Sequence, residues 1–278
     1  MTAPGVTAPG MPAPVPVLVP VPLRFTRDSA LIAGRNLRVL RKNPGRLIYP
    51  LVQPLVMLVM FVSVFGNLAL TGHGGSAGLT YREFLIPGIM IENATLTAPA
   101  SGLALLRDAS SGLADRFRSL PMSRSSVLIG RLLTDAIIFA LQAVLLLAAG
   151  YGFGFRVQGG FLDILAIIAA AVAFGLAFAT ASAWLGMAIN DPETAERVLF
   201  FPAIAVAFVS SAFAPVALLA GWMQPIARFN PVSAACGVIR LLASGGSPGF
   251  PLLELGCWVV GLLLVPGFLA IRRWQAVD

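Results

Sequence analysis

Six long apolar stretches constrain this chain more than any other feature. They run, in chain order, over about 47–70, 84–106, 127–150, 164–189, 198–220 and 252–271. Each stretch can cross the roughly 30 Å hydrocarbon core of a bilayer at about 1.5 Å per helical residue. Lipid offers no partner to backbone polar groups, so such segments must be helices. The sequence therefore predicts an all-α polytopic membrane protein with six transmembrane helices.

Composition supports this class and excludes several kinds of site. Of the 278 residues, 58% are hydrophobic and 11% are charged, whereas soluble domains are about one quarter charged. The only lysine, Lys42, is followed by Asn43, so the Gly-Lys-Ser/Thr of an ATP-binding P-loop is absent. One histidine and two cysteines form no metal-binding cluster in the sequence. We therefore expect no catalytic residue, metal or cofactor in this chain, and we expect Cys236 and Cys257 to be buried free thiols.

The amino-terminal residues predict a tail without regular structure. Residues 1–22 consist mainly of Pro, Ala, Gly and Val. Proline this dense prevents a helix and cannot pair in a sheet. A basic start followed by an unbroken apolar core, which defines a signal peptide, does not occur in this segment. We therefore expect a disordered tail over 1–22, followed by one membrane domain over 23–278.

A basic amphipathic helix is predicted just before the first apolar stretch. Residues 24–46 carry seven basic residues and one acid. At about 100° per residue, Arg35, Arg38 and Lys42 share one arc, and apolar residues share the opposite arc. The segment is too short to span a bilayer, so we expect an interfacial helix whose cations face anionic lipid headgroups. A soluble helix in a cytoplasmic tail is the alternative.

The longest polar interruption of the apolar sequence separates the second and third stretches. Within it, residues 112–120 can form about two turns of helix, which begin after Ser110 and Ser111 and end at Pro121. A short helix between two spans can transmit the motion of a soluble partner to both of them. A solvated loop with one helical turn explains the same pattern equally well.

The charges of the loops predict the orientation of the spans. The amino-terminal segment, the 107–124 loop, the loop after the fourth stretch and the carboxyl-terminal tail together hold 14 Lys and Arg residues. The alternate loops hold 4, with Arg131 left out as intramembrane. Because cytoplasmic loops carry the excess of positive charge, both termini and the 107–124 loop are expected in the cytoplasm. An ATP-hydrolysing partner can reach that loop there.

The segment between the fifth and sixth stretches is apolar although this topology places it outside. Residues 221–250 are divided by Pro225 and Pro231 into pieces too short to span. Two short helices that dip into the outer leaflet would bury this apolar surface. The sequence therefore predicts a re-entrant extracellular helical hairpin before the last span, with an ordinary extracellular loop as the alternative.

These features together resemble the ABC-2 type permease family, and in particular its daunorubicin/doxorubicin-resistance type. The segment 113–133 resembles the family pattern L-x-x-x-P-x-x-R. A second family pattern, W-hydrophobic-Q…N-P-x-[ST]…R-x-hydrophobic…G, is carried here by Trp222, Gln224, Asn230, Pro231, Ser233, Arg240 and Gly246. Relatives often have acidic residues just after the second span, where this chain has Arg107 and Asp108 and then small residues.

The resemblance implies a permease subunit of an ATP-binding cassette exporter that moves a hydrophobic or amphiphilic compound, such as a drug, an antibiotic or a lipid, outward across the plasma membrane. It implies two permease copies or two related permeases among membrane lipids, with no nucleic acid, and separate ATPase subunits that hold ATP and Mg. The helix at 112–120 would be the coupling helix, contacting the ATPase through Arg116, Phe117, Arg118 and Leu120. A lipid or polysaccharide exporter of the same architecture is the alternative.

Five polar residues within the predicted spans are candidate functional residues. Glu92, Asn93 and Thr95 lie in the second span, where an acid is costly and usually faces the bundle interior or a cavity. They line a substrate path suited to cationic compounds, or Glu92 is a protonated or paired acid that holds helices together. Arg131 and Asp135, four residues apart in the third span, predict a structural ion pair. An ion-coupled secondary transporter using Glu92 and Asp135 is the alternative function.

Overall fold

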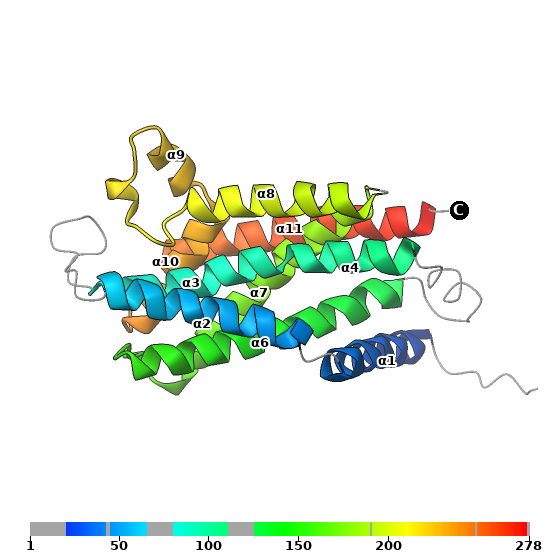
Figure 1. Ribbon diagram of the computed structural model, residues 1–278, viewed down its shortest axis with the longest axis horizontal. Coiled ribbons are helices and arrows are strands. Elements are labelled where there is room, and N and C mark those ends of the chain that lie inside the picture. The colour runs from blue at the N-terminus through cyan, green and yellow to red at the C-terminus, as the bar shows by residue number, and fades with distance from the viewer. Residues whose placement is uncertain are drawn as a thin grey trace, which may run out of the picture.

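The computed structural model of the chain describes residues 21–42, 45–65, 80–110, 125–189, 191–247 and 249–276. Every regular element in these residues is a helix. The long helices run roughly side by side in one elongated bundle (Figure 1). The predicted all-α class is therefore confirmed for the described part of the chain.

Seven of the described helices form the body of the bundle. They are α2 (Gly45–Phe65), α3 (Tyr81–Thr97), α4 (Pro99–Ser110), α6 (Ser125–Gly152), α7 (Phe161–Gly186), α8 (Pro192–Phe208) and α11 (Gly249–Ala276). The other described elements are α1 (Val21–Lys42), the 3-10 helix η2 (Val216–Leu218), α9 (Met223–Arg228) and α10 (Pro231–Ala243).

Four helical stretches in the described residues are long and apolar enough to cross a membrane. They are Tyr81–Asp108, Leu128–Gly152, Phe161–Gly186 and Gly249–Ala270. The first of them joins α3 and α4, which are separated only by Ala98. These stretches correspond to the predicted second, third, fourth and sixth spans, so the apolar pattern of the sequence located all four.

The first and fifth predicted spans are not among these four stretches. The first, 47–70, is described only as far as Phe65, and the apolar part of the described helix α2 is Pro50–Phe65. The prediction of a continuous helix over 198–220 is wrong in its second half, because α8 ends at Phe208. Residues 209–213 have no helical structure, and backbone groups of Val209, Ser211 and Ala212 are hydrogen-bonded to side chains elsewhere in the chain or in the segment itself.

Small residues let α4 and α7 approach until their backbones touch. A Cβ atom on Gly102 would lie 2.1 Å from the carbonyl oxygen of Ser182, and one on Gly186 would lie 2.5 Å from the carbonyl oxygen of Gly102. A Cβ atom on Gly175 would lie 2.8 Å from the ring of Phe139 on α6. Gly175 and Gly186 of α7 are therefore packing residues that permit close approach of the neighbouring helices.

The basic helix predicted near the amino terminus is present as α1. It lies beside the start of α6, at the end of the bundle where α4 and α11 also end (Figure 1). Ile32 and Ala33 are buried, and a Cβ atom on Gly130 of α6 would lie 2.7 Å from Cβ of Ile32. Arg38 and Lys42 are exposed. One face of α1 therefore packs closely on the bundle, and Arg38 and Lys42 lie on its exposed side.

Several helices present apolar side chains on the outside of the bundle. On α2, Val56, Met60 and Val64 are 51%, 61% and 70% exposed, and on α8 Phe201 is 69% exposed. A water-soluble bundle would bury such faces, whereas lipid or another apolar chain satisfies them. The outer surface of the bundle is therefore suited to a membrane.

The apolar segment before the last span forms two short helices, α9 and α10. Helix α10 packs among α3, α7 and α11, and eight of its residues are buried. Helix α9 projects from the bundle at the end opposite to α1 (Figure 1). The segment is thus neither an extended loop nor a span.

Candidate functional site

The predicted substrate-path residues lie on α3 in the interior of the bundle. Glu92, Asn93 and Thr95 are all buried. The Thr95 hydroxyl donates to the carbonyl oxygen of Ile91 at 2.8 Å, so its polar group is satisfied by its own helix. In the described part of the chain, the Glu92 carboxylate has no hydrogen bond or ion pair, and Asn93 Nδ2 also has no partner.

Asn93 Nδ2 is a buried donor without a partner, next to a carboxylate that has no hydrogen bond to a described residue. Buried side-chain polar atoms nearly always have a hydrogen-bond partner. An unpaired acid is costly in an apolar environment. The Glu92 carboxylate and Asn93 Nδ2 can therefore gain hydrogen bonds or charge from a partner that reaches them when the bundle opens.

A second polar cluster joins α4 to α6. Arg131 Nη2 lies 3.2 Å from Asp135 Oδ1, as an i,i+4 pair. The Ser101 hydroxyl of α4 donates to the other carboxylate oxygen of Asp135. Asp135 is 3% exposed, so both of its oxygens are engaged in a buried position. Such a doubly bonded carboxylate suits a structural role better than the carriage of a coupling ion.

Helix α1 makes polar contacts with the same two helices, α4 and α6. Arg35 Nη2 lies 3.8 Å from Asp108 Oδ2 of α4. Asn36 Nδ2 donates to the Thr134 hydroxyl of α6 at 3.4 Å. Arg35 therefore contacts the bundle, whereas its neighbours on the predicted arc, Arg38 and Lys42, remain exposed. A movement at this end of α4 or α6 would be passed to α1.

The predicted coupling residues lie between α4 and α6 in the chain. Arg116, Phe117, Arg118 and Leu120 lie outside the described residues, which stop at Ser110 and resume at Ser125. Their contact with an ATPase stays a prediction. Helix α4 precedes them in the chain and α6 follows them; the two helices are joined by the hydrogen bond from Ser101 to Asp135, and both contact α1.

A third polar arrangement surrounds the end of α8, where residues 209–213 form an unwound segment. Asn230, the N-cap of α10, accepts a hydrogen bond from Val232 N at 2.8 Å. Its Nδ2 donates to the carbonyl oxygens of Val206 and Val209 at 2.8 and 2.6 Å. Asn230 thus starts one helix and satisfies the last carbonyls of another, which would otherwise have no partner.

Two more side chains of α10 hold the unwound segment. The Ser233 hydroxyl accepts from Ser211 N at 2.8 Å. Arg240 Nη2 donates to the carbonyl oxygens of Ser211 and Ala212 at 2.7 and 3.3 Å, and its Nε donates to that of Phe84 at 3.0 Å. Its guanidinium carbon also lies 3.5 Å from the centre of the Phe84 ring. We call Asn230, Ser233 and Arg240 the α10 clasp.

Helix α3 contacts the unwound segment directly. A Cβ atom on Gly88 would lie 1.9 Å from the carbonyl oxygen of Ala212, so only glycine permits this approach. The Tyr81 hydroxyl donates to the carbonyl oxygen of Phe213 at 3.1 Å. The first half of α3, the unwound segment and α10 therefore form one interlocked unit.

The structural role of the clasp was missed by reasoning from the sequence. Asn230, Ser233 and Arg240 served there only as marks of a family resemblance. Two signals could have found the role: an Asn-Pro pair is a strong start for a helix, and a lone arginine in an apolar segment requires several acceptors. The groups that Asn230 and Arg240 bind could not be predicted from the sequence, because these acceptors lie 21 or more residues away in the chain.

The cysteines differ from their prediction in one respect. Both are free thiols, and Cys236 is buried, but Cys257 is exposed on α11. The prediction of two buried thiols is therefore wrong for Cys257, because this face of α11 is not covered by another described helix. In the part of the chain that the structure describes, His, Cys, Asp and Glu residues form no group of three that could hold a metal ion.

Comparison with known proteins agrees with this arrangement. The sequence profile of the ABC-2 type transporter family matches residues 29–242. The chain is 29% identical over 245 residues to the daunorubicin resistance ABC transporter permease protein DrrB1 of Streptomyces coeruleorubidus, which covers 87% of this chain and 82% of that protein.

Two proteins of Mycobacterium tuberculosis are also similar. The "Probable doxorubicin resistance ABC transporter permease protein DrrC" is 30% identical over 241 residues, covering 87% of this chain and 86% of that protein. The doxorubicin resistance ABC transporter permease protein DrrB is 24% identical over 237 residues, covering 80% and 82% of the two chains. With a profile match that spans most of its length, this membrane-embedded chain belongs to the ABC-2 type transporter family.

Proposed function

We propose that this chain is the permease subunit of an ATP-binding cassette exporter that moves a hydrophobic or amphiphilic compound outward. The observation that carries the proposal is similarity over 87% of the chain to a permease named for daunorubicin resistance. A drug, an antibiotic or a lipid fits this cargo class. ATP and Mg would bind to a separate ATPase subunit, so the permease would supply the path and its partner the energy.

The proposed complex holds two permeases, either two copies or two related chains, in the plasma membrane. Apolar faces such as that of α8, where Phe201 is 69% exposed, provide surface for a second permease or for lipid. Both termini are proposed to be cytoplasmic. In support, the basic helix α1 and the end of α11 lie at one end of the bundle, and α9 lies at the other (Figure 1).

Glu92 and Asn93 are proposed to line the cargo path between the permeases. Their unsatisfied side chains support this assignment, since a passing ligand can supply the missing partners. The carboxylate would favour a cationic compound. Opening would follow from rigid-body movement of the helices when the ATPase subunits close.

The ATPase is proposed to act through the segment that contains Arg116, Phe117, Arg118 and Leu120. The support is its position between α4 and α6, whose facing residues Ser101 and Asp135 are hydrogen-bonded, so that one push moves both helices. At the opposite end, α9 and α10 are proposed to sit as a re-entrant hairpin in the outer leaflet. Their short lengths and the burial of α10 support that position.

Co-purification from native membranes tests the function. The tagged chain is extracted in mild detergent and its partners are identified by mass spectrometry. We expect a P-loop ATPase in equal amount, and ATP-driven transport into inverted vesicles that persists when the proton gradient is collapsed. Recovery of no ATPase, even after crosslinking, together with transport driven by the gradient alone, would establish an ion-coupled transporter instead.

The coupling segment is tested in the same vesicles. Replacing Phe117 and Arg118 with Ala should separate ATP hydrolysis from transport while the permease stays in the membrane. Unchanged transport would remove the coupling assignment. Replacing exposed Arg197 with Ala on α8 is the matched control, because its ion pair with Glu193 lies on the helix surface.

A further inference from the structure

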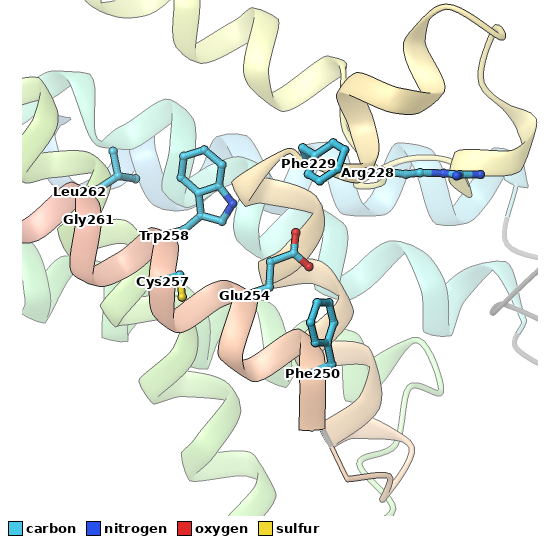
Figure 2. A pocket seen from close by; sticks show the side chains of 8 residues that line it. All are labelled: Arg228, Phe229, Phe250, Glu254, Cys257, Trp258, Gly261 and Leu262. Carbon is cyan, nitrogen blue, oxygen red and sulfur yellow. The ribbon is translucent and has the colours of Figure 1, made fainter.

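A cavity of about 570 Å³ lies between the end of α9 and the first half of α11 (Figure 2). Arg228 and Phe229 line it from the α9 side, and residues of α11 from Phe250 to Leu262 line the rest. The cavity opens on the outside of the bundle, because Phe229 and Phe250 are 76% and 78% exposed. A ligand could therefore enter it from the surrounding membrane without a movement of the helices.

Two opposite charges face this otherwise apolar cavity. The Glu254 carboxylate projects toward Phe229, and the Arg228 side chain lies beyond Phe229 and extends away from Glu254 (Figure 2). Neither Glu254 nor Arg228 has a hydrogen bond or an ion pair with any other residue that the structure describes. An unpaired carboxylate on a membrane-spanning helix is costly, so a cationic group beside it would stabilise the site.

Aromatic rings define the kind of cation that fits. Phe229, Phe250 and Trp258 stand around the Glu254 carboxylate (Figure 2). Aromatic faces attract organic ammonium groups through their negative quadrupole, and a nearby carboxylate adds direct charge attraction. Three rings and one acid are therefore suited to an ammonium group carried on a carbon chain.

Arg228 selects among ammonium compounds. A guanidinium at the same mouth repels a ligand that carries only positive charge, and it binds a phosphate strongly. A ligand that carries both an ammonium and a phosphate satisfies Glu254 and Arg228 together. The headgroup of a zwitterionic phospholipid has this pair of charges.

The outer face of α11 continues the site as an apolar stripe. Glu254, Trp258, Gly261, Val265 and Phe268 follow one another at helical spacing, about 21 Å from first to last at 1.5 Å per residue. Val265 and Phe268 are 62% and 55% exposed, and a Cβ atom on Gly261 would meet nothing within 4 Å. The stripe is longer than one leaflet, which is about 15 Å thick, so an acyl chain can lie along it.

We propose that the cavity and the stripe bind one zwitterionic phospholipid with an ammonium headgroup. The ammonium lies against Glu254 within the three aromatic rings, and the phosphate is bound by Arg228 after rotation of its side chain. One acyl chain lies along Gly261 and Val265. The proposed ligand is a resident lipid and not the exported cargo. The proposal rests on the membrane location of the chain and does not require the proposed transport function.

Native mass spectrometry of the full chain from nanodiscs tests this site. The nanodiscs contain equal amounts of phosphatidylethanolamine and phosphatidylglycerol. We expect one phosphatidylethanolamine to be retained, and Glu254→Gln to lower its occupancy about fivefold without affecting phosphatidylglycerol. Glu196→Gln, which changes an exposed acid of α8 away from the cavity, is the control and should leave retention unchanged. Equal retention by Glu254→Gln and the unchanged chain would overturn the proposal.

Labelling of Cys257 gives a test that needs no variant. This thiol lines the cavity and is exposed, whereas Cys236 is buried. Phosphatidylethanolamine nanodiscs should slow maleimide labelling of Cys257 relative to phosphatidylglycerol nanodiscs. Equal labelling in both lipids would contradict the proposal, and so would a disulfide between Cys257 of two copies, since a second permease would then cover the cavity.

A third arm separates a lipid from a simple amine. Dodecyltrimethylammonium carries the cation and the apolar chain but no phosphate. It should displace the retained lipid only weakly from the unchanged chain, and more readily from Arg228→Gln. Strong displacement that is independent of Arg228 would show that the site binds cationic amphiphiles, and the phospholipid assignment would be wrong.

Discussion

The two halves of α3 differ in how their polar surroundings are satisfied. Near the first half of α3, Arg240 donates hydrogen bonds to the carbonyl oxygen of Phe84 in α3 and to those of Ser211 and Ala212 in the unwound segment. One turn further, Glu92 and Asn93 are equally buried but have no described partner for the carboxylate or for Nδ2. Satisfied buried groups fix a structure, whereas unsatisfied ones mark a place where another partner can act. We therefore propose that the first half of α3 stabilises the fold and that the second half contacts the cargo.

Removal of the Arg240 guanidinium should have the largest effect on the satisfied half. Arg240→Met leaves the carbonyl oxygens of Phe84, Ser211 and Ala212 without donors in an apolar interior. We expect a loss of at least about 3 kcal/mol in the free energy of unfolding. Thermal unfolding in detergent, followed by tryptophan fluorescence, measures it. Arg41→Met, which changes an exposed arginine of α1 without such bonds, should unfold like the unchanged chain.

Gly88→Ala should be the next most damaging change. The new Cβ atom would lie 1.9 Å from the carbonyl oxygen of Ala212, and a backbone atom cannot rotate away. We expect a destabilisation of about 2 to 3 kcal/mol from the displaced unwound segment. Gly237→Ala on α10, where a Cβ atom meets nothing within 4 Å, is the matched control. Similar unfolding temperatures for the two variants would mean that the close approach at Gly88 does not exist.

Two ion pairs of the same i,i+4 spacing, one buried and one exposed, show how much burial changes the contribution of an ion pair to stability. Asp135→Asn removes the charge that faces Arg131 in a buried position, and we expect a destabilisation of about 2 kcal/mol. Glu193→Gln removes the charge facing Arg197 on an exposed surface, where less than about 0.5 kcal/mol is expected. The two unfolding curves, measured in one detergent, give the difference. Equal losses would contradict the structural role of the Asp135 cluster.

Glu92→Gln should have the smallest effect on stability. The change keeps the shape of the side chain and removes a charge that has no described partner, so we expect a shift below about 0.5 kcal/mol or a slight stabilisation. The same unfolding assay applies, with Arg240→Met as the reference. A loss of stability as large as that of Arg240→Met would mean that Glu92 has a structural role, and the two halves of α3 would then not differ in function.

The sequence predicted the parts of this fold that depend on local pattern. Apolar length located the four long spans, and basic amphipathic periodicity located α1. The end of α8 at Phe208 could not be predicted, because residues 209–213 are as apolar as a span and their conformation depends on Arg240, 27 or more residues later. The exposure of Cys257 likewise depends on which helices cover α11, and periodicity carries no such information.

For the candidate site, residue type identified positions but not partners. Glu92 and Asn93 were found because acids and amides are rare in spans, and the pairing of Arg131 with Asp135 follows from their spacing. That the Asp135 carboxylate is also bound by Ser101, while Glu92 has no described partner, depends on contacts between helices. The distinction between the two acids is thus a tertiary property.

The most direct test of the assignment is transport by Glu92→Gln in vesicles with the co-purified ATPase. Uptake is measured for a cationic compound and a neutral compound of matched size, at equal amounts of permease and with ATP supplied. We expect a several-fold loss for the cation and little change for the neutral compound, because only the cation can pair with the Glu92 carboxylate. An equal loss for both compounds would contradict the account and would return Glu92 to a structural role.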